Sequence, residues 1–210
     1  MEVELIAITQ YLRGDGTPEE LLEHAGRVCY RSEARGEPGA FLKARIREGH
    51  ESIIEHASAT FEISGISRAC SHQLVRHRLA SYSQESQRYV AMDDPEWVIP
   101  DDVAEDEAAL EVWETFAGQV VSAYEALRER GVRKEDARFV LPNATATRII
   151  VTMNFRELRH LFRIRISRGA QWEIRQLGVA MLEGVYPHAP AVFGDLREEL
   201  RERYPDFFAE

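Results

Sequence analysis

Residues 57–64 read ASATFEIS, a stretch in which small or apolar side chains alternate with polar ones. In a β-strand, successive side chains point to opposite faces, so Ala57, Ala59, Phe61 and Ile63 would share one face. This alternation is typical of a strand that packs one face against a core and leaves the other half exposed. It predicts a sheet, around which the remaining elements can be placed.

Two further strands are predicted from residues 3–9 and 145–153, which are rich in Val, Leu, Ile and Thr. Residues 76–88 show no clear period and are expected to form an ordered loop. Apolar side chains at helical spacing predict helices over residues 18–30, 41–48, 66–74, 155–167, 171–186 and 195–204, and a long one from Asp101 or Asp102 to Gly131. Thr17 and Glu20 are expected to form a capping box at the first of these helices, and Asn154 is expected to cap the one that begins at Phe155. The predicted fold class is α+β, with a single helix-rich domain over residues 1–210 around an antiparallel or mixed sheet.

The composition is that of an ordinary globular domain, with 44% hydrophobic and 30% charged residues among 210. No apolar run approaches the roughly 20 residues that a membrane-spanning helix needs. The first four residues are acidic where a signal peptide would be basic. Cys29 and Cys70 form no CxxC motif, so we expect a protein of the reducing cytoplasm.

The formal net charge of -10 argues against long nucleic acids and anionic membranes as partners. The charges are unevenly distributed. Residues 93–114 carry ten acids and no base, and we expect a solvated face there, with a regulatory role as the alternative. Residues 66–90 and 144–176 are basic, with four and seven arginines. Because arginine pairs well with phosphate, these two segments favour a small polyanionic ligand.

Residues 50–56 read HESIIEH and, together with His72 and His77, suggest metal binding. His50 and His56 are six residues apart, however, whereas the zinc motif HExxH has its histidines four apart on one helical face. A polar turn that satisfies the backbone, or contact with a ligand, are the alternatives. We predict no metal site.

Residues 76–89 read RHRLASYSQESQRY and combine three arginines with a histidine and several hydroxyl groups. If the chain is extended from Tyr82, then Tyr82, Gln84, Ser86 and Arg88 point the same way and could cradle a phosphate. The alternatives are a solvated basic loop and nucleophilic catalysis by Ser86, although no GxSxG motif surrounds that serine.

The predicted helix at residues 155–165 has an apolar face that includes Leu158, Leu161 and Phe162. Arg165 lies seven residues after Leu158 and therefore on the same face. Because burying an unpaired arginine is unfavourable, an anionic or acceptor-rich group should meet it. The alternatives are a glutamate of a neighbouring helix, a head group that reaches water while the stem packs, and a substrate carbonyl or ionising ring nitrogen.

These segments resemble a known family. Arg76-His77-Arg78, followed by seven residues and then Ser86, resembles the signature of flavin-dependent thymidylate synthases. Further similar blocks, in the same order as in the family, are GHES at 49–52, SQRY at 86–89, ARFVLP at 137–142, NFR at 154–156 and AQWE at 170–173. The resemblance extends from about Arg27 to Pro187.

The resemblance implies an α+β enzyme that makes dTMP by reductive methylation of dUMP. Methylenetetrahydrofolate would supply the carbon, and NADPH would reduce a bound FAD. No protein nucleophile attacks the uracil in this family. The resemblance also implies a homotetramer whose active sites are shared between subunits.

It further implies roles for individual residues. Those expected to contact dUMP are Gln73, Arg76, Gln84, Glu85, Ser86, Gln87, Arg88, Arg138 and Arg165. Those expected to hold FAD are His50, Ser52, Arg76, His77, Arg78, Leu79, Gln84, Asn154, Arg156 and His160. Arg165 would contact the uracil and favour its ionised N3. Gln84, His160 and Gly169 differ from residues found at those positions in other members.

Two other classes of function remain as alternatives. The basic segments suit a nucleotide- or RNA-binding module, and His50, Glu55, His56 and His72 suit a metal-dependent hydrolase.

Overall fold

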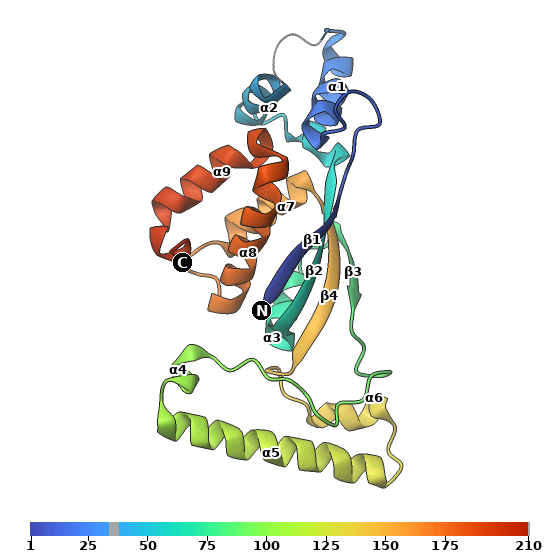
Figure 1. Ribbon diagram of the computed structural model, residues 1–210, viewed down its shortest axis with the longest axis vertical. Coiled ribbons are helices and arrows are strands. Elements are labelled where there is room, and N and C mark those ends of the chain that lie inside the picture. The colour runs from blue at the N-terminus through green and yellow to red at the C-terminus, as the bar shows by residue number, and fades with distance from the viewer. Residues whose placement is uncertain (34–37, 210) are drawn as a thin grey trace.

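The computed structural model describes residues 1–33 and 38–209. Its centre is a four-stranded sheet with the strand order β1-β2-β4-β3 (Figure 1). The strands are β1 (Glu2–Ile8), β2 (Ser58–Ser67), β3 (Ala80–Gln84) and β4 (Ala146–Asn154). All three pairings are antiparallel. The predicted α+β class is confirmed, with an antiparallel rather than a mixed sheet.

The two central strands carry the core face of the sheet. Phe61 and Ile63 of β2 and Ile149 and Val151 of β4 are buried, as the alternation in residues 57–64 predicts. On the opposite face, the hydroxyl groups of paired threonines on β2 and β4 lie 2.9 Å apart. One face is thus dry and the other is polar, which is the usual division in an antiparallel sheet.

Helices cover the dry face and extend beyond both ends of the sheet (Figure 1). They are α1 (Pro18–Tyr30), α2 (Pro38–Arg47), α3 (Arg68–Leu74), α4 (Asp101–Ala104), α5 (Glu107–Glu129), α6 (Lys134–Ala137), α7 (Phe155–Arg165), α8 (Trp172–Val185) and α9 (Pro190–Arg203). Short 3-10 helices cover η1 (Glu51–His56), Arg138–Val140, Tyr186–His188 and Pro205–Phe207. Within the described ranges, no helix is both long and apolar enough to cross a membrane.

The helices α7, α8 and α9 lie beside the sheet, whereas α1 and α2 lie at one end and α4 to α6 at the other (Figure 1). Phe193 of α9 contacts Phe155 and Phe162 of α7 in edge-to-face geometry, so aromatic rings join these two helices. Predicted caps are confirmed at α1, where Thr17 and Glu20 form a capping box, and at α7, where Asn154 accepts from the Glu157 amide.

Two predicted elements differ from the structure. Residues 80–84 form β3 instead of a loop, because β4 supplies backbone partners for them that no period in the segment reveals. The predicted long helix is divided into α4 and α5. Asp106, not Asp101 or Asp102, caps α5. Its carboxylate accepts hydrogen bonds from the backbone amides of Ala108 and Ala109 at 3.0 and 3.1 Å.

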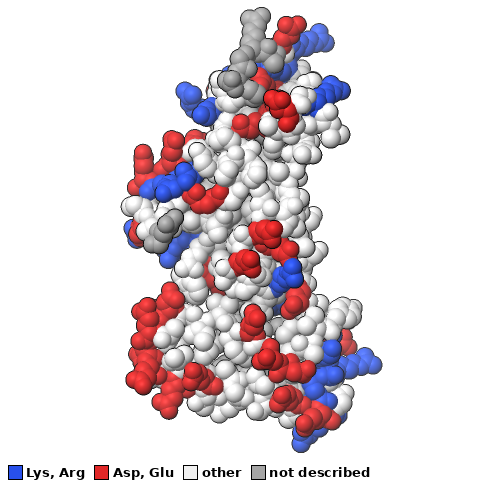
Figure 2. Space-filling view, viewed as in Figure 1, with Lys and Arg blue, Asp and Glu red and all other residues white. Residues whose placement is uncertain are grey.

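The acidic segment 93–114 lies over the connection into α4 and the first part of α5, and its acids in α4 and α5 are exposed. Figure 2 shows acidic side chains gathered at the lower left, where α4 and the start of α5 lie, whereas basic side chains lie among acidic ones at the lower right. This arrangement suits the dipole of α5, which favours negative charge at the start of a helix and positive charge at its end. The expectation of a solvated face agrees with this exposure.

Replacement of the α5 cap, Asp106→Ala, should lower the free energy of unfolding by about 1 kcal/mol, because two amides at the helix start lose their acceptor. Urea denaturation followed by circular dichroism measures the change. Asp106→Asn should retain the cap, and Asp102→Ala should change stability by less than about 0.5 kcal/mol. A larger loss for Asp102→Ala than for Asp106→Ala would contradict the assignment of the cap.

Candidate active site

The pairing of β3 with β4 brings two distant segments together. Ala80 at the start of β3 pairs with Met153 near the end of β4. The turn before β3 therefore lies beside the first turn of α7, and His77 meets Glu157, 80 residues later in the chain. The start of α3 is fixed separately, because the buried Glu173 of α8 accepts the backbone N–H of Ser67 at 2.6 Å.

His77 is the centre of this meeting point. Its side chain is buried, with its Nδ1 3.0 Å from Oε1 of Glu157 and its Nε2 3.1 Å from Nε of Arg165. Its ring also contacts the ring of His160 edge-on. Burial lowers the pKa of His77 below its usual value and outweighs the opposing effect of the Glu157 carboxylate, and the Arg165 charge lowers the pKa further. The imidazole is therefore neutral at neutral pH.

Arg165 is held by two acceptors. Its Nε donates to Nε2 of His77, and its Nη2 donates to the backbone carbonyl of Gln73 at 3.0 Å. The prediction that an acceptor-rich group meets this half-buried arginine is confirmed. Its partners are a neutral ring nitrogen and a backbone carbonyl rather than a carboxylate, so the alternative of a glutamate partner is wrong.

Glu157 was not predicted from the sequence as a site residue. It is 7% exposed and lies in the first turn of α7, where its amide donates to Oδ1 of Asn154 at 2.8 Å. A signal was available, because Glu157 lies four residues before the buried Leu161 and thus at the edge of the apolar face. An acid at such a position needs a buried partner.

Of the histidines considered for a metal, only His77 belongs to the one cluster of possible ligands found among the described residues. Among the described residues, the ligand atoms of His77, Glu157 and His160 lie within 4.8 Å of one another. Both ring nitrogens of His77 already have partners, and one of them is a guanidinium, which repels a cation. His50 and His56 are exposed, and neither belongs to this cluster.

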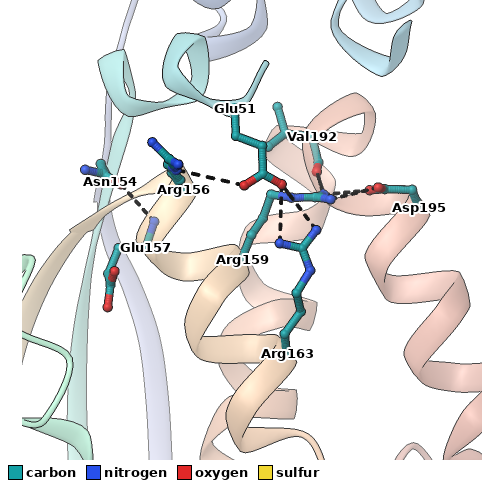
Figure 3. A network of polar contacts seen from close by, with 8 residues as sticks. All are labelled: Glu51, Asn154, Arg156, Glu157, Arg159, Arg163, Val192 and Asp195. Atoms are coloured by element: carbon teal, nitrogen blue, oxygen red, sulfur yellow. Dashed lines mark hydrogen bonds and ion pairs between the residues drawn. The ribbon is translucent and has the colours of Figure 1, made fainter. Parts of the chain in front are cut away.

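A second cluster of polar contacts fixes η1 against α7. Figure 3 shows the guanidinium groups of Arg156, Arg159 and Arg163, on successive turns of α7, around the carboxylate of Glu51. The distances to Glu51 are 3.9, 3.7 and 3.2 Å. These ion pairs hold η1, which carries Ser52 and follows His50, against α7.

Arg159 is almost fully buried, with 1% of its side chain exposed. Its guanidinium donates to both carboxylate oxygens of Asp195 at 2.6 and 2.8 Å and to the carbonyl of Val192 (Figure 3). Burial acts to raise the pKa of Asp195, but the Arg159 contact outweighs it and leaves that pKa below its usual value. The pair joins α7 to α9.

β3 and the loop after it form a different group. Gln84 points inward and donates to the hydroxyl groups of Ser71 at 3.0 Å and Thr147 at 3.3 Å. Tyr82 also points inward, and its hydroxyl donates to the carbonyls of Leu74 and His77. The strand ends at Gln84, so the expected common direction of Tyr82, Gln84, Ser86 and Arg88 does not extend past it.

A pocket of about 330 Å³ adjoins this loop and is lined in part by Arg68, His72, Gln87 and Arg138. Burial lowers the pKa of Arg68, and the charge of Arg138 lowers it further, so the two cations repel each other. The structure thus brings the predicted Gln87 and Arg138 together. Arg68 was missed, although it lies in the basic segment 66–90 that predicts anion binding.

The remaining predicted residues are more exposed. Arg88 forms an ion pair with Glu135 at 3.2 Å, and Arg156 donates to Glu55 at 2.5 Å. The exposed residues are His50, Ser52, Arg76, Arg78, Leu79, Glu85, Arg88, Arg156 and His160, whereas Ser86 and Asn154 are partly buried. Gly169 lies in the exposed turn between α7 and α8. Nothing lies within 4 Å of a Cβ placed at Gly169, so a larger residue there has room.

Removal of the half-exposed partner of Arg159, Asp195→Ala, should lower the free energy of unfolding by about 2 kcal/mol, because Arg159 stays buried without this carboxylate. The matched control is Asp206→Ala, which removes an exposed ion pair with Arg168 and should change stability by less than about 1 kcal/mol. Urea denaturation compares the two, and equal losses would contradict the role assigned to Asp195.

Comparison with known proteins shows the family. The family described as "Thymidylate synthase complementing protein" matches residues 8–191. A protein of Geobacter sulfurreducens named flavin-dependent thymidylate synthase is 51% identical over 189 residues, covering 85% of this chain and 82% of its own length. A protein of the same name from Mycobacteroides abscessus is 40% identical, covering 93% of this chain and 89% of its own.

A solved structure is also similar. It is the crystal structure of thymidylate synthase X from Helicobacter pylori with FAD and dUMP. The TM-score is 0.70 at 26% identity, covering 93% of this chain and 98% of that one. The resemblance found in the sequence is confirmed, and the chain belongs to the flavin-dependent thymidylate synthase family.

Proposed function

We propose that the chain converts dUMP to dTMP, with methylenetetrahydrofolate as the carbon donor and NADPH as the reductant of a bound FAD. The main support is Arg165, a half-buried residue that uses two of its N–H groups to donate to His77 and Gln73. The rest of its five donors remain for a carbonyl oxygen or an ionised ring nitrogen of a pyrimidine.

The pocket beside Arg68 and Arg138 supports a phosphate site for dUMP. Two guanidinium groups that repel each other at one pocket gain stability when an anion lies between them. Gln87 lines the same pocket, and Ser86 and Arg88 follow on the same loop. Arg88 would share or exchange its contact with Glu135 when it binds the phosphate. Gln73, Arg76, Gln84 and Glu85 complete the proposed substrate residues.

The cationic and polar side chains around η1 and the start of α7 could donate hydrogen bonds to a dinucleotide cofactor. Arg76, Arg78 and Arg156 are exposed cations that suit a pyrophosphate, and Asn154, His160, His50 and Ser52 add polar groups beside them. Leu79 is 72% exposed and offers an apolar surface. When bound there, FAD supplies the redox chemistry. His77 would contribute through its position, since both of its ring nitrogens have protein partners.

Assembly and location are part of the proposal. The face of the sheet that the helices leave open carries the exposed Ile6 and Ile150, which supports a homotetramer in which another copy covers it.

Cys29 and Cys70 are both free, which supports the reducing cytoplasm as the location. We also propose that residues 1–210 act as one domain.

The two alternative functions have less support. A metal-dependent hydrolase would need His50, Glu55 and His56 to converge, but both histidines are exposed and Glu55 pairs with Arg156. An RNA-binding module would need aromatic rings among its basic side chains. Tyr82, one of the two tyrosines near the arginines, bonds to backbone carbonyls.

The purified protein should be yellow, lose its flavin absorbance with NADPH and regain it in air. With dUMP and methylenetetrahydrofolate it should form dTMP, measured by chromatography of the products. A colourless protein that takes up no added FAD would contradict the proposal.

The substitution Arg165→Ala should lower dTMP formation by about 100-fold or more and leave the flavin content unchanged, because the ionised pyrimidine loses its cation. The control is Arg201→Ala, which removes an exposed arginine of α9 that pairs with Glu183 of α8. Steady-state kinetics and absorbance spectra measure the two effects. Unchanged turnover would remove Arg165 from the catalytic residues.

A further inference from the structure

We propose that Glu157 is a positioning residue that sets the tautomer of His77 and, through it, the orientation of Arg165. This inference rests on the proposed function, because it assumes that Arg165 contacts the pyrimidine. Neither the family signature nor the residues assigned above include Glu157. The series of contacts has three links, each of which is a hydrogen bond between buried or half-buried groups: Glu157 with His77, His77 with Arg165, and Arg165 with Gln73.

The first link determines where the proton of His77 lies. An ionised carboxylate only accepts hydrogen bonds, so the contact of 3.0 Å between Glu157 and Nδ1 requires the hydrogen on Nδ1. Both side chains are less than 10% exposed, at 4% for His77 and 8% for Glu157. Water therefore offers little competition, and the carboxylate selects one of the two neutral tautomers.

The second link uses the nitrogen that remains. With its hydrogen on Nδ1, a neutral His77 has a lone pair on Nε2, which accepts from Nε of Arg165 at 3.1 Å. The other tautomer, or an imidazolium, would place an N–H on Nε2 against the N–H of the guanidinium. Two donors would then face each other, so Arg165 would have to turn away.

The third link fixes the plane of the guanidinium. Nε and Nη2 lie along one edge of this planar group, and they donate to His77 and to the carbonyl of Gln73 respectively. The terminal N–H groups of Nη1 and Nη2 remain at the other end. A pyrimidine with a carbonyl oxygen next to an ionised ring nitrogen presents two adjacent acceptors, which match such a pair of donors.

The indirect arrangement has an electrostatic advantage over a direct ion pair. A carboxylate against Arg165 would orient it equally well, but it would also neutralise the charge that a developing anion needs. A neutral imidazole between the two orients the guanidinium and keeps its positive charge for the ligand. Preorganised donors of this kind stabilise a transition state without reorganisation during the reaction.

The first test measures the tautomer in the wild-type holoenzyme. ¹⁵N NMR of histidine-labelled protein distinguishes Nδ1–H, Nε2–H and imidazolium, and the His77 signals are those missing from His77→Asn. We expect His77 to be neutral with its hydrogen on Nδ1 at neutral pH. An Nε2–H tautomer or an imidazolium would overturn the proposal. This measurement needs no turnover and does not depend on whether a Glu157 variant folds.

The second test is Glu157→Gln, which keeps the shape of the side chain and removes its charge. We expect the share of the Nδ1–H tautomer to fall and kcat to drop on the order of 10-fold, with the flavin content and the KM for dUMP within about threefold. Glu183→Gln, which removes an acid of α8 that pairs with Arg197, is the control and should match the wild type.

Two results of the second test would overturn the proposal: an unchanged kcat in Glu157→Gln, or a loss of kcat that is matched by an equal loss of bound flavin. Absence of dTMP formation in the wild-type holoenzyme would instead contradict the proposed function. The tautomer measurement separates that failure from a failure of the positioning role.

Discussion

The register of three antiparallel strands is the constraint on which the rest of the structure depends. β2 and β4 pair from Ser58 with Asn154 to Ser67 with Ala146, and β3 returns along the other edge of β4 from Ala80. Because each strand leads into or follows a segment with polar side chains, this register determines which of those segments meet. A shift by one residue would also turn the buried face of each strand toward solvent. The buried side chains of the sheet therefore hold the site in place.

The arginines of α7 illustrate two uses of the same residue type. Arg159 and Arg163 meet carboxylates, and the ion pairs join α7 to η1 and α9 (Figure 3). Arg165 meets a neutral imidazole and a carbonyl instead, so its charge is not cancelled by the protein. Arg159 and Arg163 thus hold the helices together, whereas Arg165 keeps its charge for a ligand. Between these two groups the partner, rather than the arginine, makes the difference.

Local patterns predicted much of the fold and part of the site. The alternation in residues 57–64, the cap at Asn154 and the apolar face with Arg165 all depend on neighbours within a few residues, and all are present. β3 was missed because its partner, β4, is far away in the sequence. The division of the predicted long helix is a local effect: the Asp106 carboxylate accepts from the amides of Ala108 and Ala109 and begins a new helix. Glu157 was missed because its partner, His77, is 80 residues away in the sequence. Arg68 was missed because the pocket that it lines forms only when the chain folds.

Residue types and spacings were enough to predict the strands and helices with clear periods, the basic segments that favour an anion, and the family to which the chain belongs. Each of these can be recognised in the sequence without knowing what packs against it. The folded chain was needed to show that His77 is neutral, that Glu157 holds it and that Arg165 meets an imidazole and a carbonyl. Burial and the distance between charged groups determine a protonation state, and both arise only when segments 80 or more residues apart are packed together.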